Sequence, residues 1–266
     1  MEILFSYYPG RKRRAITFSY DDARKNGDVQ LVEMFNRYNV KGTFHLGSER
    51  MKTQEDKVSL EEAKELYKGH EISCHGAHHY FMENVPFGTM VNEIMSDRST
   101  LEKTAGYTVR GMSYPFGSYS DRLIGVLKKC GIEYSRTTEG TMKFGIPEDF
   151  MKWHPTCHHR FDLEELLEQF VTRKYLDMPL FYIWGHSWEF VRDNNFDKME
   201  NFLKKATQYD DIWFATNIEI YDYITAVRSL KISVDNTMIY NPTCTTVTVE
   251  VDGEPIDVKP GNNKLI

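Results

Sequence analysis

The stretch RAITFSYDDA, residues 14–23, decides the fold that we expect for this chain. Its apolar run AITF, residues 15–18, predicts a buried strand that leads directly into two adjacent carboxylates, Asp21 and Asp22. Neighbouring residues of an extended strand point to opposite faces. Asp21 and Asp22 can therefore serve two different roles at the end of one strand.

Similar apolar runs alternate with helical patterns along the chain. Strands are expected at residues 14–20, 40–46, 70–76, 180–186 and 211–217. Helices are expected at residues 28–39, 59–69, 89–104, 121–129, 162–175, 197–208 and 218–230. Ser59 and Glu62 form a Ser-x-x-Glu capping box at the start of one of them. This alternation is typical of βα units, and roughly six to eight repeats of it close an α/β barrel rather than an open sheet.

The pattern changes near the end of the sequence. In TTVTVEVDGEPIDVKPG, residues 245–261, valines alternate with polar residues before a turn at Asp252 and Gly253. We therefore expect an α/β barrel over residues 1–230 and a small β extension over residues 231–266. The plainest interpretation of the extension is a structural cap without a binding role.

Charge and hydropathy exclude several classes of partner. The formal net charge is −6, and the 33 basic and 39 acidic side chains are interspersed, so we expect neither nucleic-acid binding nor a polybasic membrane surface. No apolar run reaches the roughly 20 residues that a membrane helix needs. The first residues lack a signal-peptide pattern, so a cytoplasmic location is expected, or a secreted one if a signal was removed before this numbering began.

The four cysteines lie far apart in the sequence. Cys74, Cys130, Cys157 and Cys244 form no Cys-x-x-Cys pair, which argues against a disulfide scaffold or a thiolate zinc site. We expect all four to be reduced.

The segment HEISCHGAHHYF, residues 70–81, carries the sharpest local signal for chemistry. His75 and His79 are four residues apart, and on a helical turn this spacing would place both imidazoles on one side, able to bind one divalent metal ion. A histidine-rich turn without a metal explains the pair equally well.

The acidic doublet adds to this signal. Two histidines and one carboxylate are a donor set that leaves open positions on a zinc-type ion. The loop after the first strand and the loop after residues 70–76 would both lie at the carboxyl ends of their strands, where barrel enzymes build their sites. The two loops can therefore meet.

Four motifs follow one another in a fixed order: TFSYDDA (17–23), GHEISCHGAHH (69–79), YPFG (114–117) and IWGHS (183–187). In order and rough spacing they resemble the motifs of the polysaccharide deacetylases, carbohydrate esterase family 4, also called the NodB-homology domain. The resemblance covers about residues 14–230 and implies an irregular (β/α)7-type barrel of the NodB-homology kind.

The resemblance also implies roles for the residues of these motifs. Asp21 corresponds to the general base, and Asp22, His75 and His79 correspond to the metal ligands. His186 matches the late histidine that protonates the leaving group, a role that suits an imidazole because its pKa lies near neutrality. Taken alone, His186 is better explained as a hydrogen-bonded core histidine at a strand end, and the complete set of motifs reverses this preference.

Further residues are candidates for contacts with a substrate. The backbone amide of Phe116 in YPFG can face a developing oxyanion, although the motif also fits a plain turn. Tyr114, Trp153 and Trp188 are candidate walls for a sugar ring, and core packing is the alternative for each of them.

Two positions depart from the family pattern. Ala23 stands where the family usually has a glycine, so we expect the loop to avoid positive φ and to follow a different path. Ser113 stands where the family has an arginine that orients the base. Another cation would have to replace it, and the candidates are Arg136, Lys152 and Arg160.

Three further histidines follow in the sequence. His154, His158 and His159 are either additional site residues or part of a solvated loop.

The leading hypothesis is a metal-dependent hydrolase that removes acetyl groups from an N- or O-acetylated oligo- or polysaccharide. The alternatives are a barrel that binds carbohydrate with weak or no turnover, and a hydrolase of a small non-sugar amide. The site accepts zinc, cobalt, nickel or manganese, and zinc is the ion that we expect first. The sugar and the oligomeric state stay open.

Overall fold

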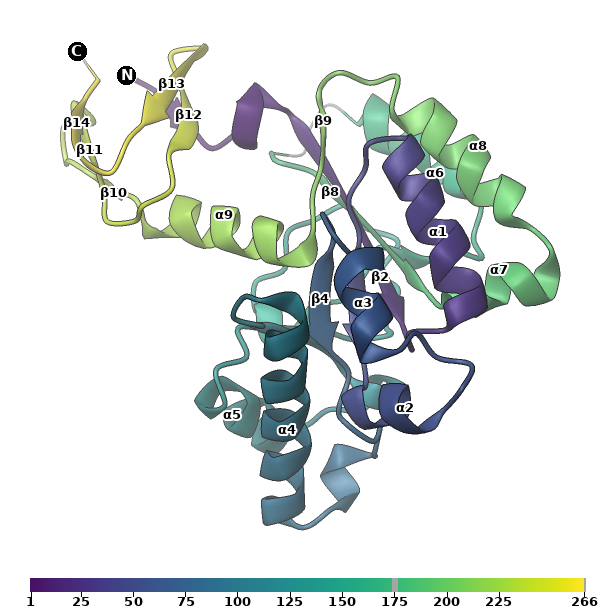
Figure 1. Cartoon of the computed structure of the whole chain (residues 1–266). Coiled ribbons are helices and arrows are strands. Elements are labelled where there is room, and N and C mark those ends of the chain that lie inside the picture. The colour runs from purple at the N-terminus through teal and green to yellow at the C-terminus, as the bar shows by residue number, and fades with distance from the viewer. Residues whose placement is uncertain (174–176, 266) are drawn as a thin grey trace.

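The fold is organised around one parallel sheet that curls into a barrel. The computed structural model describes residues 1–173 and 177–265 (Figure 1). The strands follow the order β6-β5-β4-β3-β2-β8-β7, and β9 pairs with the start of β2. They are β2 (Arg14–Asp21), β3 (Thr43–Leu46), β4 (Glu71–Cys74), β5 (Gly111–Ser113), β6 (Tyr134–Arg136), β7 (Cys157–His158), β8 (Leu180–Gly185) and β9 (Ile212–Phe214). The expected α/β barrel is therefore confirmed.

One segment connects the two edges of this sheet. Trp153 bridges to Arg136 of β6 in parallel, and a few residues later Cys157 of β7 pairs with Ile183 of β8. The segment between residues 153 and 158 thus runs from one edge strand to the other.

Helices cover the outside of the sheet (Figure 1). They are α1 (Lys25–Arg37), α2 (Ser48–Thr53), α3 (Leu60–Leu66), α4 (Phe87–Ala105), α5 (Asp121–Lys129), α6 (Leu163–Thr172), α7 (Ser187–Asp193), α8 (Phe196–Ala206) and α9 (Asn217–Ser229). Short 3-10 turns lie at η1 (Pro9–Arg11), η2 (Met82–Asn84), η3 (Pro115–Gly117) and η4 (Phe150–Lys152). The helices α2 and α7 were not expected, and the predicted helical residues 174 and 175 lie outside the described ranges.

Local capping explains where several helices begin. The Ser59 side chain accepts from the backbone N–H of Glu62, and the Glu62 side chain accepts from the backbone N–H of Ser59, so the predicted capping box is confirmed. Thr216 and Glu219 make a second box at α9. None of the helices in residues 1–173 and 177–265 is long and apolar enough to cross a membrane.

Strand β2 shows why both sides of the sheet are buried. Phe18 packs outward against helix α1, with its ring 4.8 Å from that of Phe35. Ser19 and Asp21 point inward, because both accept hydrogen bonds from Arg136 inside the barrel. The alternation along β2 therefore places apolar side chains under the helices and polar ones in the barrel interior.

The polar interior is arranged in layers. In one layer the backbone register aligns Ser19, Thr43 and Glu71 on three neighbouring strands. The next layer aligns Asp21, His45 and Ser73. This interior is a hydrogen-bonded network rather than the apolar filling common in barrels, and it leads directly to the carboxyl ends of the strands.

The β module consists of two small antiparallel sheets. One contains β1 (Ile3–Leu4), β12 (Val247–Val251) and β13 (Glu254–Val258), and the other contains β10 (Lys231–Ile232), β11 (Met238–Asn241) and β14 (Gly261–Lys264). Asp252 and Gly253, with φ of 50° and 90°, form the predicted two-residue turn between β12 and β13.

The module packs against α9 through buried apolar side chains. Val247, Val249 and Val251 share one core cluster with Ile220 and Ile224 of the helix. The domain boundary at residue 230 stays a prediction, and the module also takes in residues 3–4 through β1.

Candidate active site

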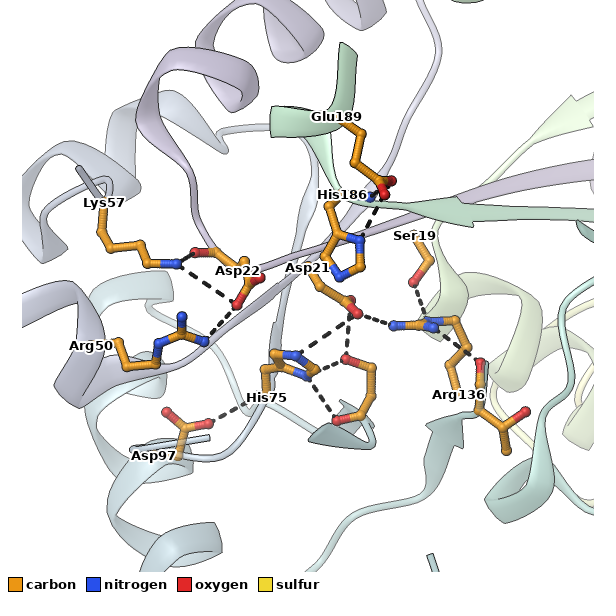
Figure 2. Close-up of polar contacts among 12 residues, drawn as sticks. Ser19, Asp21, Asp22, Arg50, Lys57, His75, Asp97, Arg136, His186 and Glu189 are labelled. Atoms are coloured by element: carbon orange, nitrogen blue, oxygen red, sulfur yellow. Dashed lines mark hydrogen bonds and ion pairs between the residues drawn. The ribbon is translucent and has the colours of Figure 1, made fainter. Parts of the chain in front are cut away.

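The candidate site lies at the carboxyl ends of the parallel strands, as the sequence predicts. Asp21 ends β2, His75 follows β4, Ser113 ends β5 and His186 follows β8. Figure 2 shows the side chains of Asp21, His75 and His186 converging from separate strands on one region. Parallel strands bring their carboxyl ends to one edge, which is why residues far apart in the sequence meet there.

Three of the expected ligands come together. One ligand atom each from Asp22, His75 and His79 lies within 4.8 Å of the other two. The rings of His75 and His79 are 4.6 Å apart between centroids. The structure thus brings together the carboxylate and both imidazoles that the sequence proposed as a metal site.

The two histidines converge through a loop, so the helical turn that we expected between them is wrong. Gly76 and His79 have φ of 75° and 62°, and these two reversals fold the segment back on itself. A side chain at Gly76 would also collide with Met82, because an added Cβ would lie 2.7 Å from its Cε. The four-residue spacing gives the right proximity by a different backbone path.

The tautomer of His75 suits a metal ligand. Its Nδ1 lies 3.0 Å from the Ser113 carbonyl oxygen and 2.6 Å from the Ser113 Oγ. A carbonyl only accepts, so Nδ1 carries the proton and Nε2 keeps its lone pair. Burial also lowers the pKa of His75 below its ordinary value, and Asp21 opposes this effect only in part. A neutral imidazole with a free Nε2 is the form that binds a divalent ion.

His79 is neutral for a similar reason. Burial, followed by the effect of His75, lowers its pKa to about 4. Together with Asp22 the two imidazoles form a two-histidine, one-carboxylate donor set, which fits zinc and related divalent ions.

Asp22 is held by two cations that the sequence did not point to. Arg50 Nη1 donates to Asp22 Oδ1 at 2.6 Å, and Lys57 Nζ donates to the Asp22 carbonyl at 2.6 Å. Burial would raise the pKa of Asp22, but His75, Lys57 and Arg50 outweigh it, so the pKa is lowered. The carboxylate is therefore ionised and anchored on its Oδ1 side.

The backbone around Asp22 corrects one expectation. Asp22 and Ala23 have φ of 85° and 52°, so Ala23 adopts the positive φ that we expected it to avoid. Its carbonyl accepts from the Val58 N–H at 2.8 Å, which holds the loop in place. This conformation costs an alanine on the order of 1 kcal/mol.

The base candidate, Asp21, has an arginine partner from an unexpected strand. Arg136 of β6 is fully buried, and its Nη2 donates to Asp21 Oδ2. Ser113 stands where the resemblance leads us to expect the arginine, and its Oγ donates to Asp21 Oδ1 at 3.1 Å. Of the proposed replacements, Arg136 is thus the one that pairs with Asp21. Lys152 instead pairs with Asp121.

Arg136 is fixed on all sides. Its Nε donates to Ser19 Oγ at 3.0 Å, and its Nη1 donates to the Thr137 carbonyl at 3.0 Å. The guanidinium also lies 4.4 Å from the ring centroid of Trp184. Burial would raise the pKa of Asp21, but Arg136 and then His75 outweigh it and hold that pKa well below its usual range. Asp21 is therefore ionised at neutral pH and able to accept a proton.

His186 lies between strand β8 and helix α7 as the N-cap residue of that helix. Burial would lower its pKa, but Glu189, Asp21 and Asp22 outweigh the effect, so the pKa is raised. A raised pKa is the direction that suits a general acid.

Glu189 also faces two further histidines. His158 and His159 are buried, and each offers a ligand atom within 4.8 Å of the other and of Glu189. The solvated-loop interpretation is therefore wrong for these two. His154 lies apart from them and contacts Thr137, with its Nδ1 2.7 Å from the hydroxyl.

The candidate substrate contacts divide into two groups. Tyr114 and Trp153 are each 1% exposed, so the proposal that they form sugar-binding walls is wrong. Tyr114 donates its hydroxyl to the Met151 carbonyl at 2.8 Å, and Trp153 packs in the apolar core. Trp188 is half-buried, with its ring 5.6 Å from that of His186, and stays a prediction.

Phe116 lies directly beside the ligand set. Its side chain is 55% exposed, and its ring centroid is 4.4 Å from that of His79 and 3.8 Å from that of Phe81. The backbone amide of Phe116 therefore belongs to a turn next to the ligands, and its oxyanion role stays a prediction.

Asp97 is another residue that the sequence analysis missed. It is a buried carboxylate of α4 that accepts from the backbone N–H groups of Ser48 at 2.8 Å and His75 at 3.1 Å. Figure 2 shows it below His75, with its hydrogen bond to the His75 backbone drawn as a dashed line. Nothing in the helical pattern of residues 89–104 marks one acidic residue as inward-facing. Asp97 fixes the loop that carries His75.

Fold and site together define a class: a curled parallel α/β barrel with two adjacent aspartates, two histidines and a late histidine at the carboxyl ends of its strands. The family model of the polysaccharide deacetylases matches residues 9–135. This match covers slightly less than half of the chain, and it confirms the assignment of the first motifs as a resemblance to that family.

Known relatives agree with this assignment. The bifunctional xylanase/deacetylase of Pseudobutyrivibrio xylanivorans is 25% identical over 113 residues, which are 42% of this chain and only 18% of that protein. A Mycobacterium smegmatis protein assigned to the polysaccharide deacetylases has a TM-score of 0.61 at 16% identity, over 85% of this chain and 96% of that one.

A second solved structure is similar over nearly the same extent. It is the carbohydrate esterase family 4 domain of a multidomain xylanase from the hindgut metagenome of Trinervitermes trinervoides. It has a TM-score of 0.56 at 15% identity, over 80% and 91% of the two chains. At these identities the solved structures establish the shared fold alone.

Proposed function

We propose that this protein is a divalent-metal-dependent deacetylase of carbohydrate, with zinc as its ion. The observation that carries the proposal is the convergence of Asp22, His75 and His79 beside an ionised, arginine-paired Asp21. The relatives named for xylanase and deacetylase activity make acetylated xylan the first substrate to test.

Each site residue would have one part in the hydrolysis. A divalent ion held by Asp22, His75 and His79 supplies Lewis acidity when bound. Asp21 takes a proton from the attacking water while the water oxygen bonds to the acetyl carbon. The Phe116 N–H faces the oxygen on which negative charge develops.

His186 completes the reaction by giving a proton to the departing nitrogen or oxygen of the sugar as its bond to the acetyl carbon breaks. A cavity of about 510 Å3, lined in part by His186, Trp184 and Met142, opens beside it. This cavity offers room for the sugar that leaves with the proton.

The test is release of acetate from acetylated xylan, chitooligosaccharides and peptidoglycan fragments by the zinc-loaded protein. We expect release from at least one of them, loss of it with a chelator, and recovery with added zinc. Asp21→Asn should keep zinc bound and lose turnover by at least about a hundredfold. Stoichiometric zinc without acetate release would favour a binding protein, and unchanged turnover in Asp21→Asn would refute the base assignment.

A further inference from the structure

A cluster outside the metal-ligand set places three imidazoles around a single carboxylate oxygen. Glu189 Oε2 lies 2.9 Å from His158 Nε2, 3.3 Å from His159 Nε2 and 3.5 Å from His186 Nδ1. The backbone N–H of His186 donates to the same oxygen at 3.3 Å. This oxygen therefore faces four nitrogen atoms.

Two arrangements can explain such a cluster: a second metal site, or a carboxylate that accepts several N–H groups. The spacing allows an ion, because ligand atoms of His158, His159 and Glu189 lie within 4.8 Å of one another. The location of the protons on the imidazoles separates the two explanations.

His158 has the wrong tautomer for a metal ligand. The backbone N–H of Arg160 donates to His158 Nδ1 at 3.2 Å, so Nδ1 carries the lone pair and the neutral ring has its proton on Nε2. That proton faces Glu189. His75 has the opposite arrangement, with its proton on Nδ1 and its lone pair on Nε2. His75 thus presents a lone pair that suits a metal ion, whereas His158 presents an N–H group that suits the Glu189 carboxylate.

His159 is consistent with the same interpretation. Its ring is stacked 4.0 Å from Phe190 and 5.7 Å from Tyr20, and the residue is 4% exposed. Its Nδ1 is buried without a hydrogen-bond partner in the described part of the chain. Its Nε2 lies 3.3 Å from Glu189 Oε2, and because a carboxylate oxygen only accepts, the proton belongs on Nε2.

His186 is the member of the cluster that points to the reaction. Its Nδ1 is buried and lies 3.5 Å from Glu189 Oε2, slightly too far for a hydrogen bond in this structure, and this carboxylate oxygen can only accept a proton from it. Figure 2 shows the His186 ring between Glu189 on one side and Asp21 on the other. A proton on Nδ1 directed at Glu189 leaves Nε2 for the side of Asp21.

We propose that Glu189 is a positioning residue: it accepts Nδ1–H of His186 and so fixes the ring with Nε2 toward the substrate, while His158 and His159 hold the carboxylate in place. This proposal rests on the proposed function, in which His186 is the acid. When His186 donates its Nε2 proton to the leaving group, Nδ1–H stays on Glu189 and the ring ends neutral.

The test compares Glu189→Gln with wild type and with Asp193→Asn. Asp193 is a matched control, because it is an exposed carboxylate of the same helix that pairs with Arg192. Urea unfolding first shows that each variant is folded. Nitrogen-15 spectra of the zinc-loaded proteins then report the tautomer of each imidazole, and kinetics on the substrate identified above report kcat and KM separately.

We expect His186 to carry its proton on Nδ1 in wild type and in Asp193→Asn, and to lose that preference in Glu189→Gln. The kcat of Glu189→Gln should fall by about tenfold or more with KM within about twofold, as for a weakened general acid. An unchanged tautomer and kcat would overturn the proposal. Binding of two zinc ions by wild type and one by Glu189→Gln would also overturn it, in favour of a second metal site.

The two proposals fail in distinguishable ways. If wild type releases no acetate from any substrate, the proposed function fails, and the imidazole spectra still decide whether Glu189 sets the tautomer of His186. If wild type is active and Glu189→Gln matches it in both readouts, only the positioning role fails.

Discussion

Arg136 and Ser113 are register partners on the neighbouring strands β6 and β5, and both donate to Asp21 from there. The arginine that the resemblance assigns to position 113 is thus replaced by one on the next strand at the same level of the barrel. The short Ser113 side chain leaves room for the guanidinium, and its hydroxyl occupies the second carboxylate oxygen. Asp21 therefore has a positive partner, although that partner stands at another place in the sequence than the resemblance implies.

Removing this partner should destabilise the fold. Arg136→Gln leaves the buried Asp21 carboxylate without its cation, so we expect the free energy of unfolding to fall by about 3 kcal/mol. Asp21→Asn added to Arg136→Gln should recover much of this loss, because no unpaired charge then remains. Urea unfolding of the single and double variants measures the coupling.

The control for this cycle is Lys152→Gln. Its ion pair with Asp121 is exposed, with side chains 41% and 91% accessible, so we expect a change below about 0.5 kcal/mol. Additivity of Arg136→Gln and Asp21→Asn would show that the two residues do not act as a pair.

Zinc binding should depend on one cluster of histidines and not on the other. We expect His79→Gln and Asp22→Asn to weaken zinc binding by about tenfold or more, because each removes a ligand of the set. His158→Gln should leave the affinity within about twofold. Calorimetric titration of the metal-free proteins measures this, and equal losses in all three variants would contradict the assignment of the site.

The contribution of Glu71 to stability should fall as the pH rises from about 5 to 8. Burial raises the pKa of Glu71 to about 7, although its oxygens accept from Tyr134, Thr43 and the Ile218 N–H. The folded state keeps a proton that the unfolded chain releases, so this stabilisation is complete below about pH 4.5 and is lost as the pH rises through 7.

Glu71→Gln should therefore remove this part of the pH slope, which amounts to up to about 3 kcal/mol across this range. Unfolding in urea at pH 5, 6, 7 and 8 tests it, with the exposed Glu61→Gln of α3 as the control. Asp28 and Asp97, whose pKa values burial raises to about 6 and about 7, add to the slope in the same direction. An unchanged slope in Glu71→Gln would show that Glu71 is not protonated in the folded protein.

Two glycine-to-alanine substitutions should change the stability of the fold in opposite directions. Gly253→Ala in the β module places a side chain at a φ of 90°, so we expect a loss of about 1 kcal/mol. Gly125→Ala in α5 meets no atom within 4 Å and should stabilise by about 0.5 to 1 kcal/mol. Thermal unfolding compares the two, and a stabilising Gly253→Ala would show that the turn has another conformation in solution.

The sequence predicted those parts of the site that depend on local order. The apolar run before Asp21 and Asp22 predicted strand β2 and the different surroundings of the two carboxylates. The spacing of His75 and His79 predicted their proximity, although the path between them is a loop, because reversals at positive φ leave little trace in a sequence.

Residues that depend on strand register could not be predicted in the same way. The sequence offered Arg136 as one of three candidates for the cation beside Asp21, and only the alignment of Arg136 with Ser113 on neighbouring strands identifies it. Glu189 meets His158 because β7 pairs with β8 so that His158 lies beside Trp184. Tyr114 and Trp153 were wrongly assigned to a substrate-binding wall, because the residue type alone does not distinguish a buried core aromatic from one that contacts a substrate.

The pairing of β1 with β12 constrains how the molecule is made. Residues 3–4 are translated long before residues 247–251, the strand with which they pair. Tyr223 of α9 donates its hydroxyl to the Tyr7 carbonyl and accepts from the Thr248 N–H. The contacts of α9 are therefore complete only when both segments are present. During synthesis the apolar side of α9 therefore stays exposed until β12 has been translated. A nascent chain that stalls before β12 would expose this apolar surface to chaperones.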